Sequence, residues 1–171
     1  MKYSIRSAVA IAAFSAAALA ACSSSSTSKP GASTTSAGGV TVPSNAVAGT
    51  TIQITISDSS GITGPETLVA SAATAGVGNV TFVVKNTGTI DHEVVVLKTD
   101  VASDKLPITG FDNEPNRVDE KSSQGETGDP PLKPGESRSF TVKNMAAGHY
   151  ALVCNIAKHY AMGMHAPLTV S

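Results

Sequence analysis

The chain has 171 residues, a length that accommodates one domain of ordinary size. Its 12 Lys and Arg residues nearly balance its 13 Asp and Glu residues, so it lacks the strong positive field that draws proteins to nucleic acid. Tryptophan is absent, whereas Thr, Val, Ala and Gly are abundant. This composition favours short strands and turns over long amphipathic helices.

The first 21 residues are predicted to be a signal peptide. Lys2 and Arg6 form a basic head, and residues 8–20 are almost wholly apolar. This is the pattern of an export leader, and the apolar stretch is too short for an ordinary membrane-spanning helix. We therefore expect the mature protein to lie outside the cytoplasm.

The leader ends in a Leu-Ala-Ala-Cys run whose last residue is Cys22. The run resembles the bacterial lipobox, which implies cleavage before Cys22 and attachment of lipid to its thiol; an ordinary leader with an incidental cysteine is the alternative. Residues 22–46 are rich in Ser, Thr, Gly and Ala, so they predict a disordered tether. We expect a lipid-anchored protein on the extracytoplasmic face of a bacterial membrane, periplasmic or at the cell surface.

Alternating apolar residues predict a β-domain over residues 47–171. Ile52, Ile54 and Ile56 alternate with polar residues, which is the period-two pattern of a strand with one buried face. Short strands without a convincing helix favour an all-β, antiparallel Greek-key sandwich. Residues 101–135 show no periodicity and are expected to form a long polar loop without a readable role. Further strands are predicted at residues 79–85, 92–98, 137–143, 149–155 and 166–170.

Cys154 has no cysteine to pair with if Cys22 carries lipid, because the chain has only two cysteines. A free thiol in an oxidising compartment needs protection. Cys154, His159 and Met164 lie in one short segment between two predicted strands, where a single loop can present all three. Thiolate, imidazole and thioether form a soft donor set that suits copper better than hard cations.

His92 is the candidate for a fourth ligand, because it begins an apolar strand whose end can face this loop. Two His and one Cys in a plane, with a long axial Met, is the geometry of electron-transfer copper. Met162 competes with Met164 for the axial position, and spacing alone does not decide between them. We predict one copper ion, Cu⁺ or Cu²⁺; a buried unliganded thiol and a zinc site are the alternatives.

The segment 148–164 resembles the plastocyanin and azurin family of cupredoxins, the type 1 or blue copper proteins. Its ligand spacing is most similar to that of rusticyanin and auracyanin. The likeness extends over about residues 47–171 and includes the His-led strand 92–96, but not the stretch 101–135. The resemblance implies a cupredoxin-like β-sandwich with three equatorial ligands and one axial ligand. In that order, the implied ligands are His92, Cys154, His159 and Met164.

Two positions depart from the family's pattern. The residue after the first ligand His is often Asn and the residue before the second is often Gly, whereas this chain has Glu93 and Lys158. Side chains around the ligands tune a metal rather than hold it, so the departures affect the expected potential more than the expected binding. His149 lies an odd number of positions before Cys154 and is expected at the surface, as is His165.

Four protein ligands leave no open position for water or substrate, so we expect an electron carrier rather than an enzyme. The chain has four histidines, too few for the additional copper sites of multicopper oxidases or copper nitrite reductases. The resemblance implies that His159 reaches the surface through an apolar docking patch, where redox proteins bind transiently. The protein is expected to be a monomer. The docking patch is expected to comprise Ala157, Tyr160, Ala161 and Met162.

Two other functions compete with electron transfer. A copper carrier or buffer would deliver copper to an oxidase or limit copper stress. Such a protein needs to release its ion, whereas a buried four-ligand site should hold it. A metal-free adhesive lipoprotein would leave the spacing of Cys, His and Met to chance.

Overall fold

A computed structural model describes residues 49–61 and 63–171. The predicted signal peptide, Cys22 and the predicted tether lie outside the described residues. Within that part of the chain the secondary structure consists of nine strands and one short 3₁₀ turn. No helix there is both long enough and apolar enough to cross a bilayer. The elements are β1 (Thr50–Asp58), β2 (Glu66–Ala70), β3 (Thr74–Ala75), β4 (Gly78–Asn86), β5 (Val95–Lys98), β6 (Ser123–Glu126), β7 (Ser137–Met145), β8 (Gly148–Val153), η1 (Tyr160–Met162) and β9 (His165–Val170).

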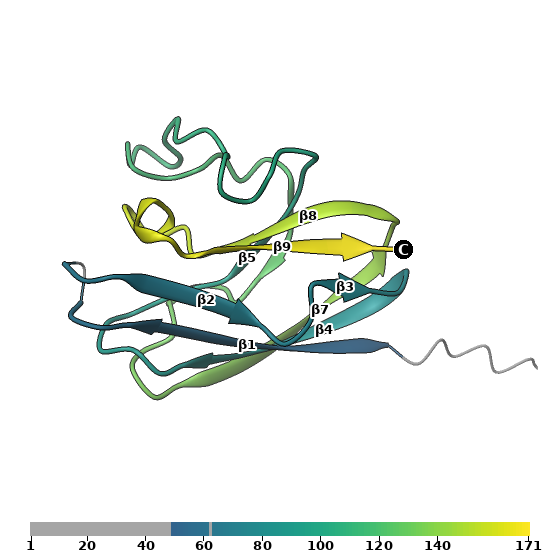
Figure 1. Cartoon of the computed structure of the whole chain (residues 1–171), viewed down its shortest axis with the longest axis horizontal. Helices are drawn as coiled ribbons and strands as arrows, with labels where there is room; N and C mark the ends of the chain where they lie inside the picture. Colours follow the sequence, from purple (N-terminus) through teal and green to yellow (C-terminus); the bar gives the residue numbers. More distant parts are fainter. Residues whose placement is uncertain (1–48, 62) are drawn as a thin grey trace, which may run out of the picture. The chain divides into compact units, whose positions relative to one another are not determined.

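The described strands form two sheets that pack as a sandwich (Figure 1). One has the order β2-β1-β4-β7 and the other the order β3-β9-β8-β5-β6. The predicted all-β sandwich is therefore confirmed. The expectation of purely antiparallel pairing is wrong, because β1 pairs with β4 and β3 with β9 in parallel. The chain visits the second sheet at β3 before it returns as β4 beside β1, and this crossover makes β1 and β4 parallel.

The core lies between the inner faces of the two sheets. Ile52, Ile54 and Ile56 on β1 are buried while the residues between them are exposed. Phe82 of β4 faces the same interior and stacks on Phe140 of β7. The period-two pattern in the sequence thus predicted the buried faces correctly.

Strand β8 is buried on both faces, as is most of β5. Val95, Ala151 and Val153 belong to a second apolar cluster, on the side of the sheet away from the main core. Residues of the long 101–135 stretch cover this side, including Val118 and Leu106. The predicted polar loop therefore has an apolar underside, and it also contributes β6 at the edge of the sheet.

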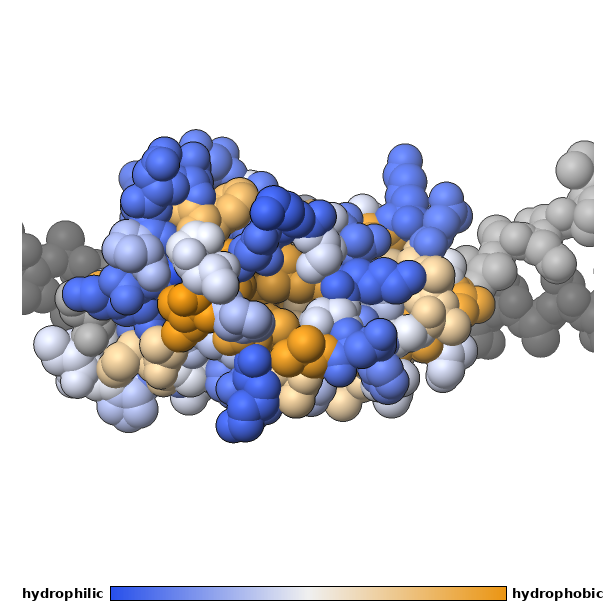
Figure 2. All heavy atoms as spheres, turned by 90° about the horizontal axis from the view of Figure 1, so that it is seen from above, coloured by the Kyte–Doolittle hydropathy of each residue, from blue (hydrophilic) through white to orange (hydrophobic). Residues whose placement is uncertain are grey.

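Figure 2 shows this covered side of the molecule, seen from above relative to the view in Figure 1. Hydrophilic side chains dominate the surface, and apolar side chains show between them. A pocket of about 300 Å³ lies here, lined by Leu97, Val101 and Leu106 among others. The loop between β8 and β9 lies at the end of the sandwich where β1 ends and β2 begins, opposite the C-terminus (Figure 1).

Candidate metal centre

Three ligand atoms from two distant parts of the sequence meet at the end of the sandwich. His92, Cys154 and His159 each offer one donor atom, and these atoms lie within 4.8 Å of one another. The two Nδ1 atoms are 3.1 Å apart, and Cys154 Sγ lies 3.8 Å from His92 Nδ1 and 3.5 Å from His159 Nδ1. All three residues are buried. The structure thus brings together three of the four predicted ligands.

These separations fit a single metal ion. Bonds of about 2.0–2.3 Å to a common ion would place nitrogen and sulfur donors roughly 3–4 Å apart, as they are here. Two imidazoles and a thiolate are soft to intermediate ligands, which suit copper rather than magnesium or calcium. The residues present therefore fit the ion that the sequence predicted.

Cys154 follows directly after β8, and main-chain contacts fix its position. Its N–H donates to the carbonyl of Met164 at 3.1 Å, which ties the start of the ligand loop to its end. The N–H of Glu93 approaches Cys154 Sγ at 3.4 Å. Because Glu93 adjoins His92, this contact links two of the predicted ligands through the backbone.

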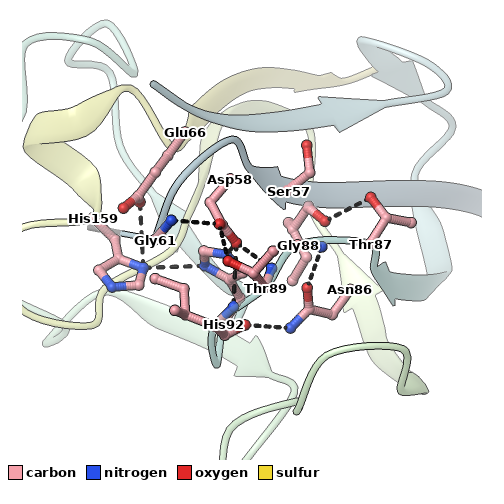
Figure 3. Close-up of polar contacts among 12 residues, drawn as sticks. Ser57, Asp58, Gly61, Glu66, Asn86, Thr87, Gly88, Thr89, His92 and His159 are labelled. Carbon is pink, nitrogen blue, oxygen red and sulfur yellow. Dashed lines mark hydrogen bonds and ion pairs between the residues drawn. The ribbon is translucent and has the colours of Figure 1, made fainter. Parts of the chain in front are cut away.

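His92 is held by a carboxylate that the sequence analysis did not identify. Its Nε2 lies 3.2 Å from Asp58 Oδ2, and both side chains are fully buried (Figure 3). Donation from Nε2–H leaves the Nδ1 lone pair for the metal, so Asp58 fixes both the tautomer and the orientation of the ring. The main chain of His92 is also fixed, by a reciprocal pair of hydrogen bonds with Leu132.

The carboxylate of Asp58 accepts several hydrogen bonds from neighbouring residues. Thr89 donates its N–H and its hydroxyl at 2.6 Å, and Gly61 donates its N–H at 2.8 Å. Burial acts to raise the pKa of Asp58, but these hydrogen bonds and that of His92 outweigh it and hold the pKa well below its usual range. A side chain at Gly88 would clash with the carboxylate, because a Cβ there would lie 2.1 Å from Asp58 Oδ2. The Asn-Thr-Gly-Thr turn after β4 is therefore built around Asp58.

Burial sets the protonation of the ligands themselves. It lowers the pKa of His92, and together with the neighbouring His92 it lowers that of His159 to about 4. It raises the pKa of the Cys154 thiol to about 12. Both imidazoles are therefore neutral, which is the form that binds a metal, while the thiolate requires a cation beside it.

The 101–135 stretch clamps the ligand loop from the outside. The side-chain carbonyl of Asn155 accepts from the N–H of Val118 at 2.8 Å, and its amide donates to Glu120 Oε1 at 2.6 Å. Arg117 pairs with Glu120 at 3.0 Å and lies 3.6 Å from Glu93. Burial raises the pKa of Glu93 to about 7. Glu93, which follows His92, and Asn155, which follows Cys154, are thus joined through this stretch. The sequence did not reveal this role of residues 101–135.

The two candidate methionines occupy different environments. Met164 is fully buried in the same core cluster as Cys154, whereas Met162 is half-buried in η1. His149 is exposed, as expected from its position on the face of β8 opposite Cys154. His165 is half-buried rather than exposed, because its ring packs 5.4 Å from that of Tyr160.

Tyr160 does not belong to the exposed part of the predicted docking patch. Only 5% of it is exposed, and its hydroxyl donates to the carbonyl of Ser103 and accepts from the N–H of Leu106, both at 2.8 Å. It therefore fastens the ligand loop to the 101–135 stretch instead of facing a partner. Ala161 is exposed, and Ala157 and Met162 are half-buried.

Lys158 occupies a position where glycine is frequent in the cupredoxin family, and the backbone conformation explains why glycine is favoured there. Its φ is 80°, in the left-handed region where a non-glycine residue costs roughly 1–2 kcal/mol. A hydrogen bond of 2.9 Å from its N–H to the carbonyl of Asn116 holds it there. The 101–135 stretch thus also stabilises this strained residue next to His159.

Comparisons with known proteins identify a family and a shared fold. A family model described as the sulfocyanin (SoxE) domain matches residues 72–171. A rusticyanin mutant structure shares the fold, with a TM-score of 0.50 and 19% identity over 72% of this chain and 79% of the other. Auracyanin from Roseiflexus castenholzii is 25% identical over 71% of this chain and 97% of its own, with a TM-score of 0.49. Auracyanin A from Chloroflexus aurantiacus, a "blue" copper protein, is 20% identical over 71% and 99%, with a TM-score of 0.46. No curated protein matched the chain.

Proposed function

The chain belongs to the sulfocyanin family of cupredoxin-like blue copper proteins, and we propose that it carries single electrons at the extracytoplasmic face of a bacterial membrane. Its cofactor is one copper ion, and cupredoxins of this kind are extracytoplasmic electron carriers rather than enzymes. Copper bound by these ligands supplies one-electron chemistry by alternating between Cu⁺ and Cu²⁺. The observation that carries the proposal is the buried cluster of His92, Cys154 and His159.

The protein's part in this chemistry is to keep the ligands in place in both oxidation states. Asp58 holds His92, and Asn155 and Tyr160 fasten the ligand loop to the 101–135 stretch. A site held this firmly rearranges little when the charge of its ion changes, which favours rapid electron transfer. The burial of the ligands also favours retention of the ion over release to a client protein.

Met164 would supply the thioether ligand of the copper ion, because it is the fully buried one of the two candidate methionines and lies in the same core cluster as Cys154. Met164→Leu should raise the reduction potential, since loss of the thioether weakens Cu²⁺ binding more than Cu⁺ binding. Each tenfold change in this preference corresponds to about 59 mV for a one-electron couple. Met162→Leu is the matched control and should leave the potential nearly unchanged. The reverse pattern in protein-film voltammetry would make Met162 the ligand.

Redox partners are proposed to dock over His159, at a patch that comprises Ala157, Ala161 and Met162. His159 is buried in the same loop as these exposed and half-buried residues, and its carbonyl accepts from the N–H of Met162 at 3.1 Å, which favours a short path for electrons to the surface. Ala161→Glu should slow bimolecular electron exchange at unchanged potential, because a charge obstructs close apolar contact. Ala147→Glu, at an exposed turn at the other end of β8, should leave the rate unchanged. Equal rates for both variants, measured by NMR line broadening, would move the docking surface elsewhere.

Anchoring through Cys22 is the remaining part of the proposal. The Leu-Ala-Ala-Cys run supplies the lipid acceptor and the Ser-rich segment after it supplies a spacer. Cys22→Ala should shift the protein from the membrane pellet to the soluble fraction of fractionated cells. Ser23→Ala is the control and should remain in the pellet. Membrane retention of Cys22→Ala would refute anchoring through this residue.

A further inference from the structure

Glu66 is a second buried carboxylate at the metal centre, and it contacts His159 where Asp58 contacts His92. It is the first residue of β2, and its side chain is fully buried. Its Oε2 lies 3.3 Å from Nδ1 of His159 (Figure 3). This Nδ1 is the same atom that faces Cys154 Sγ and Nδ1 of His92. The carboxylate therefore points toward the side of His159 that faces the metal position.

Neither oxygen of Glu66 has a hydrogen-bond partner among the described residues. In the same part of the chain no Lys or Arg forms an ion pair with it; its one charged-group contact is with His159. His159 serves as a metal ligand only when it is neutral, so it does not supply the missing positive charge. Burial, together with the negative charge of Asp58, raises the pKa of Glu66 to about 7. Without a cation beside it, the protein therefore destabilises the charged form of this carboxyl group.

The position of Glu66 is fixed by close contact with the ligand loop. A Cβ on Gly163 would lie 3.2 Å from the carbonyl oxygen of Glu66. Gly163 also has a φ of 111°, which favours glycine. Because Gly163 lies between His159 and Met164, the backbone of β2 packs directly on the loop that carries these two predicted ligands. The backbone of Glu66 is thus fixed close to the ligand loop, from which its buried side chain reaches His159.

We propose that the carboxylate of Glu66 faces the bound copper ion and favours its divalent, oxidised state. This inference rests on the proposed function, because it takes the His92–Cys154–His159 cluster to be the copper site. A Glu66 carboxylate adds one negative charge to those of the Cys154 thiolate and Asp58, and at a given distance it attracts Cu²⁺ twice as strongly as Cu⁺. Inside a protein of low dielectric constant, this difference favours the oxidised state. A carboxylate oxygen is also a harder group than the other donors and interacts better with the divalent ion.

The test compares divalent and monovalent ions in the full-length protein. Glu66→Gln keeps the shape of the side chain but removes its charge. It should weaken Zn²⁺ binding about tenfold or more while Cu⁺ binding changes less than about threefold, both by competition with chromophoric chelators. The reduction potential of the copper form should rise correspondingly, by about 59 mV for each tenfold change. Glu126→Gln, which removes an exposed carboxylate on β6, should change none of these values.

Glu66→Asp provides a second, independent test, because it keeps the negative charge in the same pocket. It should retain most of the preference for Zn²⁺ that Glu66→Gln loses. Equal effects of Glu66→Gln on Zn²⁺ and Cu⁺, or no effect on either, would overturn the proposal. A wild-type protein that binds copper without an intense visible band would instead contradict the type 1 site itself, and the zinc titration would still report on Glu66.

Discussion

Replacing Cys154 with serine is expected to abolish the intense visible absorption of the copper-loaded protein while the β-sandwich persists. The band requires charge transfer from a thiolate, and Cys154 is the one cysteine within the described residues. A serine hydroxyl is a poor ligand for a soft ion and will not replace the thiolate. It is slightly smaller than the thiol and can still accept from the N–H of Glu93, so burial of its oxygen should cost about 1–3 kcal/mol at most.

Absorption and circular dichroism of the same samples check this prediction. The near-native far-UV spectrum should remain when the visible band is lost. Ser103→Ala is the control and should keep the visible band, because the Ser103 main-chain carbonyl that accepts from Tyr160 is retained. A visible band of unchanged intensity in Cys154→Ser would show that the chromophore lies elsewhere.

Asp58→Asn should produce the second largest effect, on both copper affinity and stability. Both oxygens of Asp58 accept hydrogen bonds from donors, including Thr89 and His92. Either orientation of an asparagine amide would place its NH₂ group against some of these donors. Unsatisfied groups of this kind cost roughly 1–3 kcal/mol. Release of His92 should weaken Cu²⁺ binding by about 10- to 100-fold, the usual effect of losing a group that orients a metal-binding histidine.

Denaturant unfolding of the metal-free protein and competitive copper titration measure these two effects separately. Asp100→Asn, at an exposed position just after β5, is the matched control and should change neither quantity. Unchanged copper affinity in Asp58→Asn would mean that the contact with His92 does not orient the ligand.

The sequence predicted the strands whose apolar residues alternate or form continuous runs, because burial on one or both faces determines those patterns. It missed β2, β3 and β6. Strand β2 presents only two well-buried side chains, Glu66 and Leu68, and β3 has two residues. β6 is the exposed edge of its sheet with the sequence Ser-Gln-Gly-Glu. Their pairing is imposed by neighbouring strands, and their own residues carry too little apolar pattern to predict it.

The spacing of Cys154, His159 and Met164 carried the prediction of the site, and the structure brings the distant His92 to it. Asp58 was missed although a signal exists: it continues the inward-facing series Ile52, Ile54 and Ile56. A charged residue at a buried position requires a partner. That partner depends on which strand ends meet in three dimensions. The same holds for the contacts of the 101–135 stretch, because its polar sequence does not indicate which surface it covers.

The most direct test of electron transfer measures electron self-exchange and copper loss on the same copper-loaded protein. A site closed by buried ligands and held by Asp58 and the 101–135 stretch should exchange electrons rapidly and lose copper slowly. We predict fast self-exchange, with copper retained through many redox cycles in the presence of a high-affinity chelator. Sluggish self-exchange, together with surrender of copper from the reduced protein within seconds, would contradict electron transfer and identify a copper carrier.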